Sequence, residues 1–378
     1  MANSVHPGSY SLLSLKLVVG LNSTSPVAYD VRSTFLTMNI YENLYSNTLS
    51  GNVTLIDSNN MIDNVPIKGN EHINIKFKTS FTDDVIDLTF KIYKIDNVVN
   101  YAQKAKTYNL QFISEEAITN YNYRISKKYV GTKELIVKDI ISKISKKSVF
   151  TDSLLTSYTM FFPNWNPFKC INYMLNFISI DSNTSDYMFW ESLYGFKLKS
   201  LSLMLKEKSK HNINSNITIA RSQKSGGEKQ KYNQSNYETI TDLAIPNIID
   251  DLGNIMQGSY GATTYISDIL NKTSNKYQYT YDDSDSSNNM INIHNDNNYN
   301  YNLIMKRNSI INLMKSNTIF TSVPGITERT VGDMMNVNII SNEVENRLDS
   351  TLSGKYICTG ICHNFTPQIY TQNLSLFK

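Results

Sequence analysis

The chain has 378 residues, enough for roughly two to four domains of ordinary size. Hydrophobic residues make up 40% of it and charged residues only 18%, and the net charge of +3 is spread along the sequence. This hydrophobic content is sufficient for buried cores. The even spread of charge excludes a basic segment that would bind along a nucleic-acid phosphate backbone. No window approaches the about 18 consecutive apolar residues of a membrane-spanning helix, so we expect no membrane insertion.

Uncharged polar residues fill the place of the missing charges, and tyrosine alone occurs 25 times. Such a surface suits a protein that buries much of itself against neighbours, because amides and phenols cost less to desolvate than ions. An AT-rich genome, whose codons favour Asn, Lys, Ile and Tyr, would give the same bias, and composition leaves both explanations open. The segment Met1–Val5 lacks the charged-then-apolar pattern of a signal peptide, so we expect a cytosolic product with reduced cysteines.

Strand patterns dominate from Tyr10 to about Ser114. Ile73, Ile75 and Phe77 alternate with polar residues, which gives one buried and one solvated face. Turn residues separate these runs, and no long helical pattern interrupts them. This spacing predicts a sandwich or a small barrel.

The period then changes to that of helices. Apolar residues lie on one face of Thr132–Lys147, with Thr132 as a candidate N-cap. A second helix is predicted from Asn166-Pro167, a cap followed by proline at the first helical position. Strand patterning over Tyr187–Leu205, with a turn near Tyr194-Gly195, completes a separate α+β unit.

The middle of the chain is polar. The pattern predicts an exposed, mobile loop over Lys206–Tyr237, then a helix over Asp242–Met256 that Pro246 interrupts early and Gly258 ends. Strands are predicted for Thr263–Ile269 and Tyr277–Tyr281.

The low-complexity segment Asp282–Asn302 is predicted to have a mobile core. A short helix over Asn302–Met314 precedes the last β section. There Met335, Val337 and Ile339 largely alternate with polar residues, and strands are predicted for the segments Tyr356–Cys362 and Gln372–Phe377.

Two clusters resemble metal sites. Cys358, Cys362 and His363 lack a fourth ligand nearby, and on a strand the two thiols would share a face opposite the histidine, so buried thiols are the expected reading. The run that begins at Asp283 and Asp285 starts like a calcium loop. It continues with Ser287 but has Asn288 where glycine is needed and His294 where a bidentate glutamate belongs, which favours an acidic surface loop.

The remaining candidates also fail on spacing. Ser225–Lys229 lacks the phosphate-loop pattern, and no hydrolase or protease motif surrounds any of the histidines at positions 6, 72, 211, 294 and 363. The neighbouring carboxylates Glu115-Glu116 and Asp83-Asp84 would lie on opposite faces of a strand, so solvated charge is expected there. We therefore predict no catalytic, cofactor-binding or metal site and no cofactor.

Several short segments are informative through their order along the chain. The N-terminal half carries Leu36–Met38, Glu42–Tyr45, Gly51–Asn60 and Pro66–Glu71. Further along, the segment Tyr108–Ser126 follows in matching order.

The second half of the chain continues the same order. It carries the helix start Asn166–Phe168, the hairpin Phe189–Phe196, and the turns Val323–Gly325 and Val331–Asp333. Taken in this order, the segments resemble the baseplate central hub protein of T-even-type contractile-tailed phages. The resemblance weakens between about 205 and 300.

The resemblance implies a mainly β fold with an α+β insertion: two tail-tube-type β-barrel domains plus an inserted mixed domain. We expect the first barrel at 1–114, the insertion at 115–205, and a polar middle region at 206–302 that partly belongs to the second barrel. The second barrel is expected at 303–378, completed with strands from about 187–220.

The resemblance also implies a function and partners. It indicates a homotrimer whose six barrels join a hexameric tail tube, or its initiator protein, to a trimeric central spike in the virion. Tape-measure and baseplate wedge proteins are further expected partners, and DNA is expected only in passage through the lumen. Two alternatives stay open: a β-rich cell-wall-degrading tail enzyme, and a hub adaptor of another contractile injection system.

Overall fold

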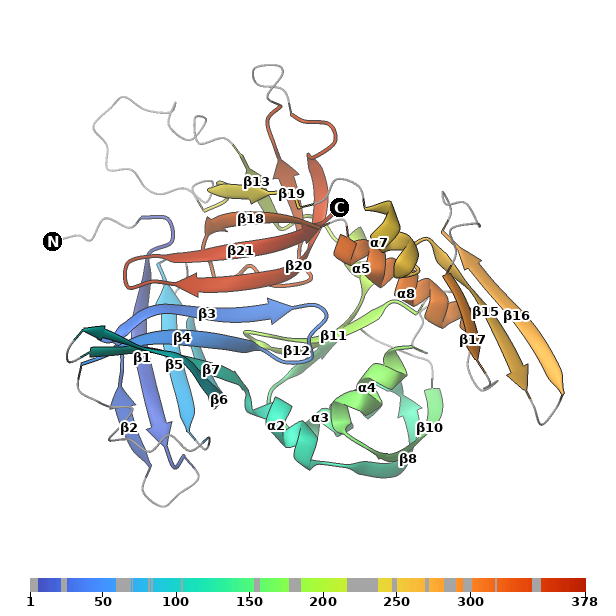
Figure 1. The fold of residues 1–378 in the computed structure, drawn as a ribbon, viewed down its shortest axis with the longest axis horizontal. Helices are drawn as coiled ribbons and strands as arrows, with labels where there is room; N and C mark the ends of the chain where they lie inside the picture. Colours follow the sequence, from blue (N-terminus) through green and yellow to red (C-terminus); the bar gives the residue numbers. More distant parts are fainter. Residues whose placement is uncertain are drawn as a thin grey trace.

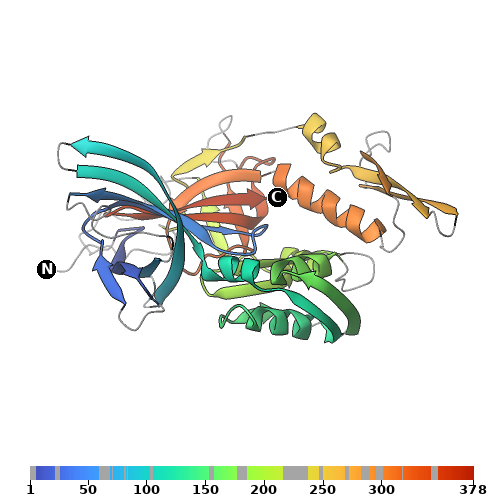
Figure 2. The same cartoon turned by 60° about the horizontal axis from the view of Figure 1, so that its bottom comes forward.

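The structure, a computed structural model, describes residues 6–21, 26–58, 69, 71–80, 82, 84–102, 105–152, 157–176, 185–215, 237–246, 250–268, 272–281, 290–294, 301–316, 318–341 and 348–378. Two barrels that share one sheet form the body, and an α+β unit packs against it (Figure 1). An arm of three strands and two helices extends away from the barrels (Figure 2). Within these ranges no helix is both long and apolar enough to cross a bilayer.

The first barrel consists of antiparallel strands in the order β3-β4-β7-β6-β5-β1-β2. A corner from Val31 to Thr34 brings the two ends of this order together: Val31 N–H donates to the Leu15 carbonyl, and Ile56 N–H donates to the Thr34 carbonyl. Alternating apolar side chains fill the interior. The strands are β1 (Tyr10–Val19), β2 (Val27–Asp30), β3 (Phe35–Asn43), β4 (Ser50–Asp57), β5 (His72–Thr79), β6 (Val85–Ala102) and β7 (Ala105–Ser114).

The second barrel runs β14-β18-β21-β20 and continues through β19 to β13, which pairs parallel with β19. It closes where Asn214 N–H donates to the Glu238 carbonyl and Ile240 N–H donates to the Asn214 carbonyl, because the chain passes directly from there into β14. The strands are β13 (His211–Asn214), β14 (Asp242–Ala244), β18 (Thr318–Pro324), β19 (Met334–Asn338), β20 (Gly354–Phe365) and β21 (Tyr370–Phe377).

One strand pair joins the barrels. β20 pairs antiparallel with β3, so that Asn364 lies opposite Asn39, and a single sheet runs through both barrels. Each barrel nevertheless has its own core, one around Val53 and Leu110 and the other around Ile357. The predicted mainly β fold of two barrels with an α+β insertion is confirmed.

The α+β unit follows β7. Two of the predicted helix starts are confirmed: the Thr132 hydroxyl accepts from Leu135 N–H, and Pro167 occupies the first turn of its helix, although the Asn166 side chain makes no capping bond. Strands β8 and β10 form a ribbon, and β9 pairs with the β11–β12 hairpin. The elements are α2 (Glu115–Asn122), β8 (Ile125–Thr132), α3 (Lys133–Ser142), β9 (Val149–Thr151), β10 (Ser157–Trp165), α4 (Pro167–Leu175), β11 (Tyr187–Ser192), β12 (Gly195–Ser200) and α5 (Leu201–Lys206).

The arm comprises the described residues between 250 and 316. Asp250 caps its first helix by accepting from Gly253 N–H, and Gly258 with φ +68° follows the helix, as predicted. A small core around Ile266 and Met305 joins its sheet to its long helix. The elements are α7 (Asp251–Met256), β15 (Gly261–Asp268), β16 (Thr273–Thr280), β17 (Met290–His294) and α8 (Tyr301–Ser316).

Two element predictions are wrong in part. The strand expected up to Leu205 ends at Ser200, because the Ser200 hydroxyl accepts from Leu203 N–H and starts helix α5. The helix expected from Asp242 begins only at Asp251, because residues 242–244 pair with β18 as a strand.

Other predictions fall partly outside the described residues. Within the expected loop Lys206–Tyr237, residues 211–214 form β13, and positions 216–236 are not described. Within the low-complexity segment, 290–294 form β17, and positions 282–289 and 295–300 are not described. Of the strands expected to complete the second barrel, β13 joins it, whereas β11 and β12 pair with β9. The division at 114, 205 and 302 stays a prediction.

Candidate functional site

The Cys358, Cys362 and His363 cluster does not come together. A register shift between Cys358 and Gly360 reverses the alternation of β20, so Cys358 lies in the second core while Cys362 is half-buried beside Asn39. The expectation that both thiols share a face is therefore wrong. In the part of the chain that the structure describes, no three His, Cys, Asp or Glu side chains are arranged to hold a metal ion.

The other sequence candidates divide into described and undescribed positions. The segments with Asp283 to Asn288 and Ser225 to Lys229, and also Asp83, lie outside the described residues, and His294 lies on β17. His6 and Asp84 are exposed, whereas His72 and His211 are buried.

Glu115 and Glu116 open helix α2 and are not on a strand. Glu115 is exposed, but Glu116 is buried, which corrects the expectation of a solvated pair.

The hairpin formed by β11 and β12, residues 187–200, lies where the two barrels and the α+β unit meet. We call it the junction hairpin. Every residue of β11 is buried. Leu193 at its turn belongs to the core of the first barrel, Trp190 to that of the second barrel, and Phe189 and Phe196 to that of the α+β unit. One hairpin therefore fixes three bodies relative to one another.

Beside the hairpin, a chain of polar groups joins the same three parts. Lys197 Nζ of β12 donates to the Thr330 hydroxyl at 2.6 Å, and that hydroxyl lies 2.8 Å from Glu42 Oε1 of β3. Val331 N–H donates to the same Glu42 oxygen at 3.0 Å. Burial lowers the pKa of Lys197, and the nearby Glu42 carboxylate opposes this effect. Lys197 is half-buried and hydrogen-bonded, so the set of Lys197, Thr330 and Glu42 holds the three parts in place, and we call this set the lock.

Asp333 extends this lock toward β13. Its Oδ1 lies 2.6 Å from Lys210 Nζ, and its Oδ2 accepts from Thr330 N–H. His211 Nε2 lies 4.0 Å from Oδ2 of the same carboxylate. The pKa of His211 is lowered to about 4, first because burial disfavours the charged ring and second because of Arg329, while Asp333 opposes both.

Arg329 begins a second buried chain. It donates to Gln372 Oε1, whose amide nitrogen donates to the Tyr370 hydroxyl at 2.9 Å. That hydroxyl lies 2.7 Å from His363 Nδ1. The other ring nitrogen, Nε2, lies 3.7 Å from Glu42 Oε2. The loop after β18 is thus tied to both barrels.

A separate ionic contact ties the α+β unit to the first barrel. Lys147 Nζ lies 2.6 Å from Glu191 Oε1 and 2.9 Å from Glu116 Oε2. The other oxygen of Glu191 accepts from Leu49 N–H of the first barrel at 2.8 Å. Burial raises the pKa of Glu191, and Lys147 opposes it. This set is satisfied on every side and offers no free acid or base for catalysis.

The arm is attached at its own base. Arg307 of α8 donates to the Ser185 and Tyr187 carbonyls at the start of the junction hairpin, and burial lowers its pKa to about 10. Lys315 at the other end of α8 lies 5.0 Å from the centre of the Tyr45 ring. The arm is thus anchored to the same junction.

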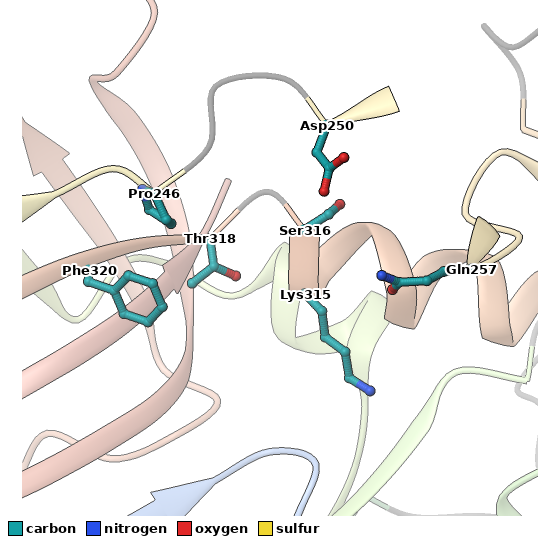
Figure 3. Close-up of a pocket in the computed structure, with 7 residues that line it drawn as sticks. All are labelled: Pro246, Asp250, Gln257, Lys315, Ser316, Thr318 and Phe320. Carbon is teal, nitrogen blue, oxygen red and sulfur yellow. The ribbon is translucent and has the colours of Figure 1, made fainter. Parts of the chain in front are cut away.

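A pocket of about 260 Å³ lies between the end of α8 and the edge of the second barrel (Figure 3). Its single carboxylate, that of Asp250, already caps α7. The pocket is a crevice at the base of the arm. Its lining residues are Pro246, Asp250, Gln257, Lys315, Ser316, Thr318 and Phe320.

The sequence carried a signal for part of this junction. Tyr187–Trp190 is an unbroken apolar run that continues into Glu191, and such a run indicates a strand buried on both faces. No local signal marked Glu42, Lys197 or Arg329, because their partners lie far away in the sequence.

Comparisons with known proteins agree with this architecture. No protein-family model matches the chain, and no curated protein matches it. Among solved structures, the 43 kDa tail protein of prophage MuSo2 from Shewanella oneidensis is 11% identical, with a TM-score of 0.60 and coverage of 98% of each chain.

Two further tail proteins share the fold. The tail protein from Neisseria meningitidis MC58 is 9% identical, with a TM-score of 0.58 over 98% of this chain and 97% of its own. Prophage tail protein gp18 from Listeria monocytogenes EGD-e is 12% identical, with a TM-score of 0.50 over 97% and 94%. At these identities the likeness is one of fold.

Proposed function

We propose that this chain is a structural hub subunit of a contractile phage tail baseplate. Three copies form a ring of six barrels, which joins a hexameric tail tube or its initiator protein to a trimeric central spike. The ring surrounds the channel through which DNA passes, and tape-measure and wedge proteins are further partners. The protein is made in the host cytoplasm and resides in the virion.

The observation that carries this proposal is the pair of barrels fused through β3 and β20. Three chains with two barrels each present six similar units, so a ring of them matches a sixfold partner on one face and a threefold partner on the other. The solved tail proteins of the same fold support the assignment to a phage tail.

The junction supports a mechanical role. The barrels and the α+β unit are locked through one hairpin and through buried charge pairs that are costly to break. A subunit that passes force between a tube and a spike needs such a fixed geometry. The alternative of a cell-wall hydrolase predicts turnover of peptidoglycan that a single substitution abolishes; the hub proposal predicts no turnover.

Light scattering on the purified chain at micromolar concentration tests the proposal. We expect a mass three times the 43.1 kDa of the chain, either alone or after addition of a trimeric spike protein. A monomer under both conditions would contradict the ring.

A further inference from the structure

The outward side of the shared sheet carries a row of uncharged polar residues that crosses both barrels. Strand pairing places Thr371 of β21 beside Asn364 of β20, then Asn39 of β3, Asn52 of β4 and Gln111 of β7. We call these five residues the amide row. The row passes from the second barrel to the first without a break, because β20 and β3 are paired at this position (Figure 1).

The outward positions beside the amide row are uncharged as well. On one side the row of Asn373, Cys362, Tyr41 and Ser50 crosses the same strands. Each of these residues is one pairing step from the core-facing positions, which places it on the outer side of the sheet.

On the other side of the amide row lie Thr37, Thr54 and Asn109. Beyond β7, the next strand β6 carries charged side chains in the described part of this face: Lys94 and Asp96 pair with each other, and Gln111 of the amide row donates to Asp96. At the far end of β20, where that strand pairs with β19, Lys355 is exposed. The absence of charge is thus a property of the shared face and ends at its border.

The amides of this face are hydrogen-bonded to one another. Asn364 Nδ2 donates to Asn39 Oδ1 at 2.7 Å, and Asn39 Nδ2 donates to Asn52 Oδ1 at 3.1 Å. Asn52 Nδ2 then donates to the Tyr41 hydroxyl at 3.2 Å. Because these donors are already used within the sheet, the face offers few groups that could hold a passing molecule.

From these observations we infer that the uncharged face around the amide row is the wall of the channel, and that it serves to let DNA slide past without binding. The inference rests on the proposed function. In a ring of three chains, both barrels of each chain must contribute to the inner wall of the channel. The shared sheet is a surface to which both barrels contribute. A wall without Lys or Arg releases no counterions from phosphates and therefore gives DNA no affinity. A wall without carboxylates does not repel it.

Three matched cysteine variants test where this face lies in the assembled ring. Thr54→Cys probes the wall in the first barrel, Thr371→Cys probes it in the second, and Thr159→Cys is the control on the exposed outer side of the β8–β10 ribbon. All three are made with Cys362→Ser, which removes the half-buried native thiol. Cys170 and Cys358 are buried, and burial raises the pKa of both thiols, so they stay unreactive.

Each variant is assembled, its mass is measured, and it is treated with biotin-maleimide and then with streptavidin, which is wider than a channel that fits one DNA duplex. For a wall position we expect full biotinylation but loss of streptavidin capture in the ring, with capture restored on denaturation. The control should be captured in both states.

Two results would overturn the inference while leaving the ring intact. Failure of biotin-maleimide itself to react at Thr54→Cys or Thr371→Cys in a trimer would place the face in a contact between copies. Capture by streptavidin in the native trimer would place it on the outside. If the parent protein and the variant are both monomeric, the result contradicts the proposed function. It then also contradicts the inference that this face is a channel wall.

Discussion

The junction hairpin and the arm are held in opposite ways. The hairpin contributes side chains to three cores, and buried ion pairs surround it. The sheet of the arm has only a small core around Ile266 and Met305, whereas the C-terminal end of α8 packs Met314 into the second core, beside the contacts of Arg307 and Lys315.

The difference indicates that the two regions of the chain unfold differently. Loss of any contact at the hairpin disturbs three bodies at once, so the barrels and the α+β unit should unfold as one cooperative unit. The sheet of the arm, β15 to β17, should open by itself at a lower free energy, because only the small core around Ile266 and Met305 holds it. Four predictions test this contrast.

The largest effect is expected at Trp190, whose side chain is fully buried in the second core. Trp190→Ala should lower the global free energy of unfolding by about 4 kcal/mol, because it leaves a large cavity. Chemical denaturation followed by circular dichroism measures this. The control Tyr265→Ala removes a ring of the arm that is 40% exposed and should cost less than about 0.5 kcal/mol. Equal losses in the two variants would contradict the contrast.

Acid should weaken the junction through His211. Its pKa of about 4 in the folded chain lies below the ordinary value near 6.5, so the unfolded chain binds more protons between these values. Stability is therefore lost as the pH falls from about 6.5 toward 4, by roughly 3 kcal/mol at most from this group.

Denaturation midpoints measured over that range in the parent and in His211→Gln check this prediction. The variant should lose less stability on acidification than the parent. The same pH slope in both proteins would show that His211 does not carry the effect.

Lys197→Met keeps the length of the side chain but removes the donor to Thr330. We expect the free energy of unfolding to fall by about 2 kcal/mol, because the Thr330 hydroxyl next to Glu42 loses its charged donor. The matched variant Lys199→Met changes a half-buried lysine on the same strand, whose ion pair among the described residues is with Glu207, and its loss should be smaller. If the Lys199 variant is the less stable of the two, the result contradicts the claim that Lys197 holds the junction.

The smallest global effect is expected for Arg307→Met. The loss should be about 1 kcal/mol and confined to the arm, because the side chain anchors α8 through carbonyl contacts at one place. Hydrogen exchange should become faster in β15 and at the start of α8, and stay unchanged in β3 and β20. Faster exchange throughout the barrels would contradict an independently opening arm.

Local features of the fold could be predicted from the sequence. Alternation in β5, the cap at Thr132, the proline at 167 and the glycine at 258 each act within a few residues, and the structure has them where the pattern placed them. The errors at α5 and β14 come from tertiary contacts that override local pattern: Asp186 and Ser200 hold the start of α5, and β18 pairs with 242–244.

The junction could be predicted only in part. The apolar run of β11 marked a strand buried on both faces, but the partners of Lys197 are more than 130 residues away in the sequence. The bulge in β20, which separates Cys358 from Cys362, and the burial of Glu116 by Lys147 likewise depend on packing that no short motif reports.

Electron microscopy of the purified assembly tests the central claim most directly. The account predicts a ring of three chains in which six barrels surround an axial channel, with the sheet that contains β3 and β20 facing that channel. Particles that are single chains, or pairs related by a twofold axis, would contradict it.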